Sequence, residues 1–423
     1  MILILQIRRF FVSLLFFAGC FTSFSQSYKN AIYTPSIKTL TICKDGNWSS
    51  LPILNLAAEN VIHLSFDEMS HDYHRLSYRI IHCNSDWKKS DLATPEFMNG
   101  FPENDFEDGI QSVGTYTPYT HYALQLPNPN VQLLVSGNYV VEVFDKYKPK
   151  ELLLTACFSV LEQKVRINAT VTATTDVDYK KEHQQLDLNL SPIGLTIAQP
   201  LQELQLVVQQ NHSRDQEVRA IKPDNIVGDN LIFEHNAKLI FKGGNEFRRF
   251  ETTTHKYAGL NINRIEYFKP YYNAELLPAT KRSNGYLFDK DQNGRFVVTS
   301  QEAQHAATGA DYFLVHFSFP MDEPFLDGAM HLYGDFVLNN LDETSKMSYN
   351  FEHKAYEKAL LLKQGSYNYR YALKKTGSSF ANSQPIEGSY WETENEYQIY
   401  VYYRPFGSRY DKLIGYKQLQ TNF

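Results

Sequence analysis

The chain has 423 residues, enough for about two to four domains of ordinary size. Its net charge is -6 at pH 7 and no long basic run occurs. This argues against nucleic acid as the main partner, because phosphate binding needs clustered Lys and Arg. The chain contains 29 Tyr and 28 Phe but only 6 Met, a bias that favours strands over helices.

Residues 1–26 have the pattern of a signal peptide, in which two arginines precede the apolar run FFVSLLFFAG (10–19). That run is too short to span a bilayer, and no later stretch has the length and apolarity to span one. Ser23-Phe24-Ser25 predicts cleavage before Gln26. The alternative is a lipobox, Phe17-Ala18-Gly19-Cys20, which would place a lipid on Cys20, although Phe17 is unfavourable at its first position. Both alternatives, cleavage before Gln26 and lipidation of Cys20, predict an exported protein without a membrane span of its own.

Strand-length runs rich in β-branched and aromatic residues follow the export signal. The clearest are VIHLSF (61–66), LSYRIIHC (76–83), NYVVEVF (138–144) and LLLTACFSV (152–160), before the polar joint LEQK (161–164). Their number and spacing predict an N-terminal β-sandwich over residues 27–162.

A second set of strands begins at VRINATVTATT (165–175) and predicts a middle β-sandwich over 163–262. Within it, NLIFEH (230–235) and KLIFKG (238–243) are predicted to form a hairpin that turns at Asn236.

The third region, 263–423, contains the strongly alternating run DYFLVHFSF (311–319). AYEKALLLK (355–363) fits a strand better than a helix, and the last two runs, NEYQIYVYYRP (395–405) and DKLIGYKQL (411–419), are assigned to the same domain. The predicted fold class is therefore all-β, with three tandem immunoglobulin- or fibronectin-like β-sandwich domains.

One short stretch, YRIIHCNSDW (78–87), raises the question of a Cys–His nucleophile. A nucleophilic cysteine needs its base within hydrogen-bond reach, and strand alternation places His82 and Cys83 on opposite faces. Cys43, Cys83 and Cys157 are widely spaced, which argues against a zinc cluster and allows one disulfide at most. We interpret Cys83 as a small buried apolar residue.

DKDQNGRF (289–296) resembles the beginning of a calcium loop, but Ser300 stands where the loop requires a bidentate Glu. A hairpin over 285–298 with its turn at Asn293-Gly294 is the simpler interpretation. No Ser-His-Asp order, phosphate loop or HExxH motif is present. The sequence therefore predicts no catalytic residue, no metal site and no cofactor.

Two aromatic and Arg-rich stretches are candidates for a partner surface, because Tyr and Arg often anchor interfaces. One is the turn in YVYYRPFGSRYDKLIGY (400–416), and the other is FKPYYN (268–273). The predicted partner-binding residues are Arg404, Phe406, Arg409, Tyr410, Tyr271 and Tyr272.

A weaker pattern runs from LYGDFVLNN (332–340) to GSYNYRYAL (365–373) and resembles early-set glycan-binding sandwich modules. Val337 and Asn339 stand where such a module would carry a sugar-stacking Trp. A periplasmic glycan-binding β-sandwich protein is the alternative function that this resemblance leaves open.

Longer stretches resemble one particular family. LSYRIIHCNSDWKKSDL (76–92) and TPYTHYALQLPNPNVQLLVSGNYVVEVFD (117–145) are similar to the N-terminal domain of the type IX secretion system plug protein family of Bacteroidota. EGSYWETENEYQIYVYYRPFGSRYDKLIGY (387–416) is similar to the C-terminal end of that family, whereas 165–262 matches only in its strand pattern.

This resemblance implies a non-enzymatic, steric role. Members of the family are expected in the periplasm, on the inner side of the outer membrane, where they close the mouth of the large translocon barrel called SprA or Sov when no cargo is engaged. The other side of the gate belongs to a partner called PorV, so plugged complexes are expected to exclude it.

Overall fold

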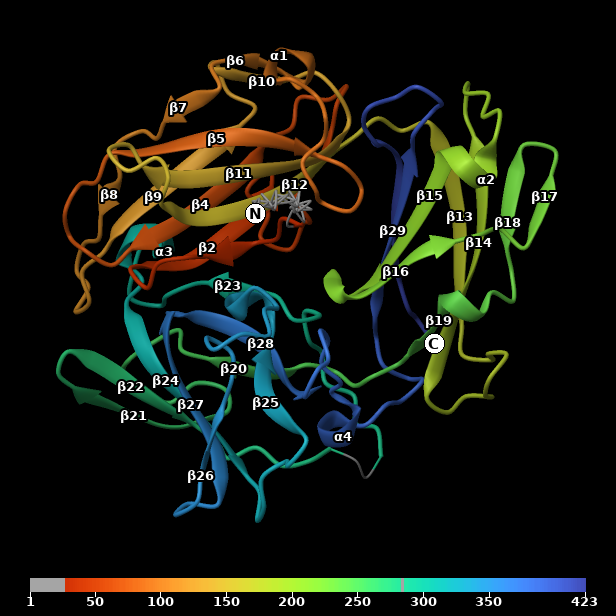
Figure 1. Ribbon diagram of the computed structural model, residues 1–423. Helices are drawn as coiled ribbons and strands as arrows, with labels where there is room; N and C mark the ends of the chain where they lie inside the picture. Colours follow the sequence, from red (N-terminus) through yellow and green to blue (C-terminus); the bar gives the residue numbers. More distant parts are fainter. Residues whose placement is uncertain (1–26, 283–284) are drawn as a thin grey trace, which may run out of the picture.

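The computed structural model describes residues 27–282 and 285–423, so the predicted signal peptide, with Cys20, lies outside the described residues. Strands form three two-sheet β-sandwiches, which confirms the predicted all-β class (Figure 1). In Figure 1 the first sandwich lies at the upper left, the middle one at the right and the third below them. No helix of the described residues is long and apolar enough to cross a membrane.

The first sandwich has one six-stranded and one four-stranded sheet, with the orders β1-β12-β11-β5-β7 and β2-β4-β9-β8, and β3 pairs with β12. Strand β9, THYALQL, alternates buried and exposed positions, as expected of a strand with one face in the core. One core of Leu, Ile, Val, Phe and Tyr side chains fills the space between the two sheets. The strands are β1 (Ala31–Ile32), β2 (Ile37–Lys44), β3 (Ile53–Asn55), β4 (Ile62–Glu68), β5 (Leu76–Cys83), β7 (Glu103–Asp105), β8 (Ile110–Gln111), β9 (Thr120–Leu126), β11 (Gly137–Asp145) and β12 (Leu152–Leu161), with α1 (Thr94–Phe97) and the small pair β6 (Met98–Gly100) and β10 (Val131–Leu133) at one end.

The middle sandwich is completed by the two last strands of the chain. Its sheets have the orders β13-β14-β18-β17, with β19 on β14, and β16-β15-β29-β30. Its elements are β13 (Val165–Thr172), β14 (His183–Pro192), α2 (Pro200–Glu203), β15 (Leu204–Gln210), β16 (Ser213–Ile221), β17 (Asn225–Val227), β18 (Asn230–Phe233), η1 (Ala237–Leu239), β19 (Ile240–Lys242), β29 (Glu396–Tyr403) and β30 (Lys412–Gln420).

The predicted boundary of the C-terminal domain at 263–423 therefore differs from the structure. β29 pairs along its whole length with β15, and its buried residues Tyr397, Ile399 and Val401 belong to the middle core. Without β29 one edge of β15 would be unpaired. The alternating pattern of β29 identifies a strand but not the neighbour with which it pairs.

The predicted hairpin at Asn236 is also wrong, because β18 and β19 each pair with β14 and not with each other. The side chain of Asn236 accepts a hydrogen bond from the Lys238 amide at 3.1 Å and begins the short helix η1, which carries the chain along β14.

The third sandwich has a sheet with the order β20-β28-β23, to which β25 adds on β28, and a second with the order β21-β22-β24-β27-β26. Its elements are β20 (Arg248–Glu251), β21 (Ile262–Phe268), β22 (Tyr271–Leu276), β23 (Phe296–Val298), α3 (Ala306–Gly309), β24 (Tyr312–Pro320), β25 (Gly328–Tyr333), η2 (Asp335–Val337), β26 (Ser348–Asn350), β27 (Ala355–Lys363), β28 (Gly365–Lys375) and α4 (Gln384–Glu387). AYEKALLLK is a strand, β27, as predicted, whereas β20 lies in this sandwich although the sequence assigned it to the middle one.

Buried polar contacts join the first sandwich to the third. Lys363 Nζ of β27 lies 2.6 Å from Asp67 Oδ2 of β4, and each side chain is 1% exposed. Tyr312 donates its hydroxyl to the same oxygen at 2.7 Å, and His121 Nδ1 lies 2.7 Å from Asp67 Oδ1. Burial lowers the pKa of Lys363, and Asp67 opposes that shift by stabilising the ammonium.

The first and middle sandwiches meet around Arg214 of β16. Its guanidinium lies 3.7 Å from the centre of the Trp87 ring and donates to the Tyr28 carbonyl at 2.7 Å. Nearby, the Ser85 amide donates to Asp411 Oδ2 at 2.9 Å. A cation over an indole face and a charge-assisted hydrogen bond both strengthen when water is excluded.

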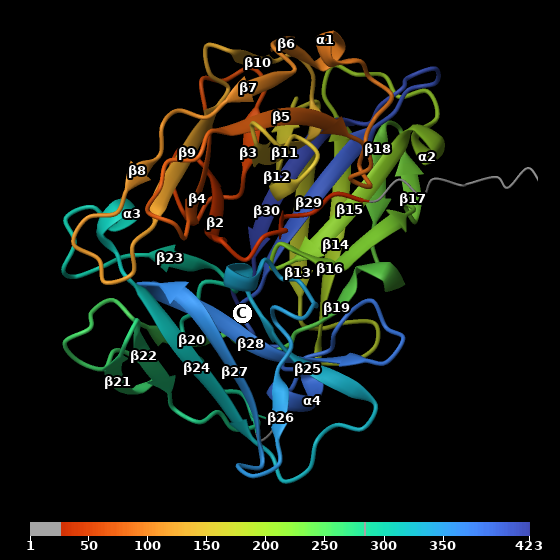
Figure 2. The same cartoon turned by 60° about the vertical axis from the view of Figure 1, so that its left-hand side comes forward.

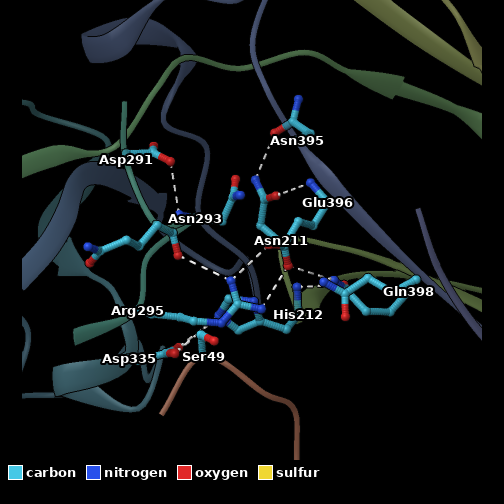
Figure 3. A network of polar contacts seen from close by, with 12 residues as sticks. Ser49, Asn211, His212, Asp291, Asn293, Arg295, Asp335, Asn395, Glu396 and Gln398 are labelled. Atoms are coloured by element: carbon cyan, nitrogen blue, oxygen red, sulfur yellow. Dashed lines mark hydrogen bonds and ion pairs between the residues drawn. The ribbon is translucent and has the colours of Figure 1, made fainter. Parts of the chain in front are cut away.

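The middle and third sandwiches share an ionic network (Figure 3). Arg295 donates to Glu396 at 2.7 Å, and His212 lies 3.1 Å from Asp335. Each sandwich therefore contacts both others, and a cavity of about 680 Å³ is lined by residues from all three. The packing of the three sandwiches against one another can be followed in the ribbon of Figure 2. The three sandwiches therefore pack in a closed triangular arrangement, in which each contacts the other two, and not end to end in a row.

Candidate functional site

The turn between β29 and β30, one of the two predicted partner surfaces, is largely engaged within the chain. Arg409 pairs with Glu96 of α1, and the Tyr410 ring packs edge-on against His82 at 5.3 Å between centroids. Arg404 lies 3.6 Å from Asp411. Phe406 differs from these residues, because its side chain is fully exposed at 101%.

The second predicted surface, around Tyr271 and Tyr272, is more open and contains more aromatic residues than the sequence indicated. Tyr272 lies within 5.0 Å of Tyr116 and 4.9 Å of Tyr267, between ring centroids. Tyr116, Tyr267 and Phe268 are 54%, 46% and 61% exposed. We call the β21–β22 hairpin together with Tyr116 the aromatic arm. It stands at the outer margin of the third sandwich, at the lower left of Figures 1 and 2.

Tyr116 reaches the aromatic arm from the first sandwich. Its loop is held there because Asp311, just before β24, accepts hydrogen bonds from the Tyr116 amide at 2.7 Å and the Thr117 amide at 3.0 Å. Burial raises the pKa of Tyr272 to about 12, and the neighbouring Tyr116 adds to the shift. The arm is therefore neutral over the physiological pH range at this tyrosine.

A cleft of about 320 Å³ beside the arm is lined by Tyr116, Pro118, Pro270 and Tyr271. Its walls also include the polar residues Lys38, His71 and Thr117 and the apolar residues Pro35, Met69 and Leu361. A cleft of this size and lining suits one large side chain, in the way that interface pockets take aromatic anchors.

The structure does not bring the two predicted surfaces together, because the β29–β30 turn belongs to the middle sandwich and Tyr271 and Tyr272 to the third. The high density of aromatic residues in FKPYYN (268–273) was the sequence feature that indicated the arm. Nothing in the sequence pointed to Tyr116, which lies more than 150 positions before Tyr272.

His82 and Cys83 lie on opposite faces of β5, as the alternation predicted. His82 packs with Tyr139 and Tyr410, and its Nδ1 lies 2.9 Å from Ser90 Oγ, whereas Cys83 packs with Trp87. Burial lowers the pKa of His82 to about 4 and raises the pKa of the Cys83 thiol. This environment opposes formation of a thiolate, so the geometry does not support a nucleophilic Cys83.

The predicted hairpin over 285–298 is replaced by a loop that leads into β23. Asp289 pairs with Arg249 at 2.5 Å, and Asp291 accepts hydrogen bonds from the backbone amides of Phe247 and Asn293. These carboxylates therefore fasten the loop to the beginning of β20. Burial raises the pKa of Asp291 to about 6. Within residues 27–282 and 285–423 no group of three or more metal-binding side chains occurs.

The positions expected to mark a glycan platform lie in and after the short helix η2. Val337 is buried, and Asn339 donates to Asp335 Oδ1 at 2.8 Å. Neither position stands on an open strand face, so the glycan-binding alternative receives no support from this part of the third sandwich.

Comparison with known proteins identifies relatives of the chain. Residues 37–162 match the family described as type 9 secretion system plug protein, first domain. A crystal structure of a hypothetical protein from Parabacteroides merdae is 43% identical and superposes with a TM-score of 0.92, covering 94% of this chain and 100% of that one. A search of curated proteins finds no match.

Other solved structures are far less similar. The alkylpurine DNA glycosylase AlkC of Pseudomonas fluorescens, bound to DNA, is 14% identical over 30% of each chain with a TM-score of 0.17. The partial N-terminal region of an enterococcal surface protein is 6% identical over 93% of this chain and 95% of that one, also with a TM-score of 0.17. Scores at this level carry no argument about fold or function.

Proposed function

Because the chain belongs to the type IX secretion system plug family, we propose that it closes the periplasmic mouth of the outer-membrane translocon barrel while no cargo is engaged. The observation that carries the proposal is the family match over residues 37–162, since a β-sandwich fold by itself selects no function. The translocon is the SprA or Sov barrel that the family resemblance implies, in complexes that exclude PorV. The proposed location is the periplasm, on the inner side of the outer membrane.

The proposed role is steric and needs no catalytic residue. A plug must resist deformation when the barrel and its cargo press on it. The closed arrangement of the sandwiches supports such a role, because buried ion pairs join the third sandwich to both others, Lys363 with Asp67 and Arg295 with Glu396. The first and middle sandwiches are joined by the Arg214 guanidinium over the Trp87 ring. Breaking a buried ion pair is costly, so the sandwiches are expected to move together.

A reversible plug also needs a contact surface from which its partner can dissociate. The aromatic arm and Phe406 supply exposed aromatic side chains without a large continuous apolar face, which suits a contact of modest size. We propose the arm, with Tyr271 and Tyr272, as the main contact with the barrel, and Phe406 as a second contact.

The proposal is tested by purifying the C-terminally tagged protein from gently solubilised outer membranes, with and without a secretion cargo arrested in the translocon. Recovery of the barrel protein without PorV in the cargo-free cells alone is the expected result. Recovery of the barrel protein under both conditions would support the barrel as the partner but would reject the proposal that cargo releases the plug. Failure to recover the barrel under either condition would reject the plug function.

A companion experiment measures closure directly. Cells that lack the protein are expected to admit a large hydrophilic antibiotic that the intact outer membrane excludes, and the plasmid-borne gene is expected to restore exclusion. Unchanged exclusion in the deletion strain would contradict a role in closing the pore.

A further inference from the structure

Strand β21 has a backbone edge that no other described strand pairs with. It is the end strand of the sheet β21-β22-β24-β27-β26, and it is seven residues long. Such an edge presents unpaired N–H and C=O groups that match another extended chain. Only its first residue, Ile262, is buried, and five of the next six residues are exposed.

The other long end strands of the described sheets are contacted along or near their edges by neighbouring elements. β30 receives hydrogen bonds from the Glu162 and Lys164 amides at 3.0 and 2.7 Å, and Lys417 of β30 donates to the Ile167 carbonyl of β13 at 3.2 Å. β2 meets Tyr312 through Thr39, and β16 meets the first sandwich through Arg214. The same contact from Lys417 lies at the outer edge of β13, and β25 exchanges backbone hydrogen bonds at its outer edge with Ser345 and Met347, both at 2.9 Å. The remaining end strands are two to four residues long. The edge of β21 therefore differs from the others in being both long and open.

The two faces of β21 have different chemistry. Ile265 and Tyr267 share the face that continues the aromatic cluster, since Tyr267 lies directly across from Tyr272 in the ladder. Arg264 and Glu266 share the other face, 3.5 Å apart and both about half exposed. A strand laid beside β21 would meet an apolar, aromatic row on one face and a positive group followed by a negative group on the other.

We propose that an extended segment of the translocon protein pairs with the free edge of β21 and adds a strand to this sheet, an inference that rests on the plug function proposed above. The matching segment has apolar side chains on the face of Ile265 and Tyr267, an acidic residue opposite Arg264 and a basic residue opposite Glu266, because cross-strand pairs of opposite charge are favourable. Main-chain hydrogen bonds supply affinity in this mode, and alternate side chains supply specificity. A large side chain at the end of the segment would enter the cleft lined by Tyr116 and Tyr271.

Amide hydrogen exchange distinguishes strand addition from contact through side chains alone. The complex of the full-length protein with the barrel, purified through the tag, is compared with the free protein. We expect exchange of those amides in 262–268 that face away from β22 to slow by about tenfold or more in the complex, because they become hydrogen-bonded. If a complex forms and exchange in β21 does not change, the strand addition is rejected while the plug function stands.

A matched pair of variants tests the same contact by affinity. Tyr267→Asp places a charge on the aromatic face, and Phe351→Asp is the control, since Phe351 is also an exposed aromatic residue of the third sandwich at 79% exposure. We expect Tyr267→Asp to lower recovery of the barrel by about tenfold or more and the control to leave it within about twofold. Equal recovery by both variants would overturn the proposal. If the unmodified protein recovers no barrel, the plug function fails, and this inference fails with it.

Discussion

Replacing Lys363 with Met tests whether the buried contact between the first and third sandwiches holds the triangle together. The side chain of Met fills similar space, so the change removes the charge and the hydrogen bonds that the ammonium donates to Asp67 and to the Ala307 carbonyl. Asp67 would then keep its carboxylate at 1% exposure with hydrogen bonds from Tyr312 and His121 but without its cationic partner. Breaking a buried pair by removing one partner costs about 3–5 kcal/mol. We expect the lower end of that range, about 3 kcal/mol, because two hydrogen bonds to Asp67 remain.

The assay is urea unfolding followed by far-UV circular dichroism, with two further variants. Lys346→Met removes the exposed pair with Glu343, in which the Lys and Glu side chains are 44% and 86% exposed, and is expected to cost less than about 1 kcal/mol. The double variant Asp67→Asn, Lys363→Met leaves no uncompensated charge and is expected to regain part of the stability lost in Lys363→Met alone. A loss in Lys363→Met as small as that of the exposed control would refute the reasoning.

Three further predictions concern other contacts. Arg214→Ala removes the cation above Trp87 and one charge-assisted hydrogen bond, and should lower the free energy of unfolding by about 2–3 kcal/mol, measured by the same urea assay. Burial raises the pKa of Glu246 to about 7, so the folded state binds its proton more tightly than the unfolded state; stability should fall as pH rises from about 4.5 to 7, and the slope should shrink in Glu246→Gln. Tyr410→Ala, which removes a ring packed on the first core, should lower the thermal midpoint, whereas Phe406→Ala should leave it unchanged. Equal thermal midpoints for these two variants would contradict the conclusion that Tyr410 packs on the core of the first sandwich while Phe406 is exposed.

Local patterns in the sequence identified most of the strands. DYFLVHFSF became β24 with alternating partly and fully buried positions, and AYEKALLLK became β27. The alternation of side chains along β5 also placed His82 and Cys83 correctly on opposite faces. These features follow from the two-residue repeat of a strand, which is a property of neighbouring residues alone.

The loop over 285–298 shows where local reasoning failed. Asn293-Gly294 is a strong turn signal, and Asn293 does adopt a left-handed backbone with φ of 53°. The carboxylate of Asp291 nevertheless bonds to the Phe247 amide, more than forty positions earlier, and that contact draws the chain away from a hairpin.

The sequence by itself determined the strand content, the family and the aromatic density around Tyr271 and Tyr272. Only the tertiary structure decided that β29 joins β15, that Tyr116 completes the aromatic arm and that the edge of β21 stays open. The physical reason is that alternation specifies which face of a strand is apolar but not which strand lies beside it. Pairing between distant segments is chosen by the fit of whole sheets and cores, and that choice has no local signature.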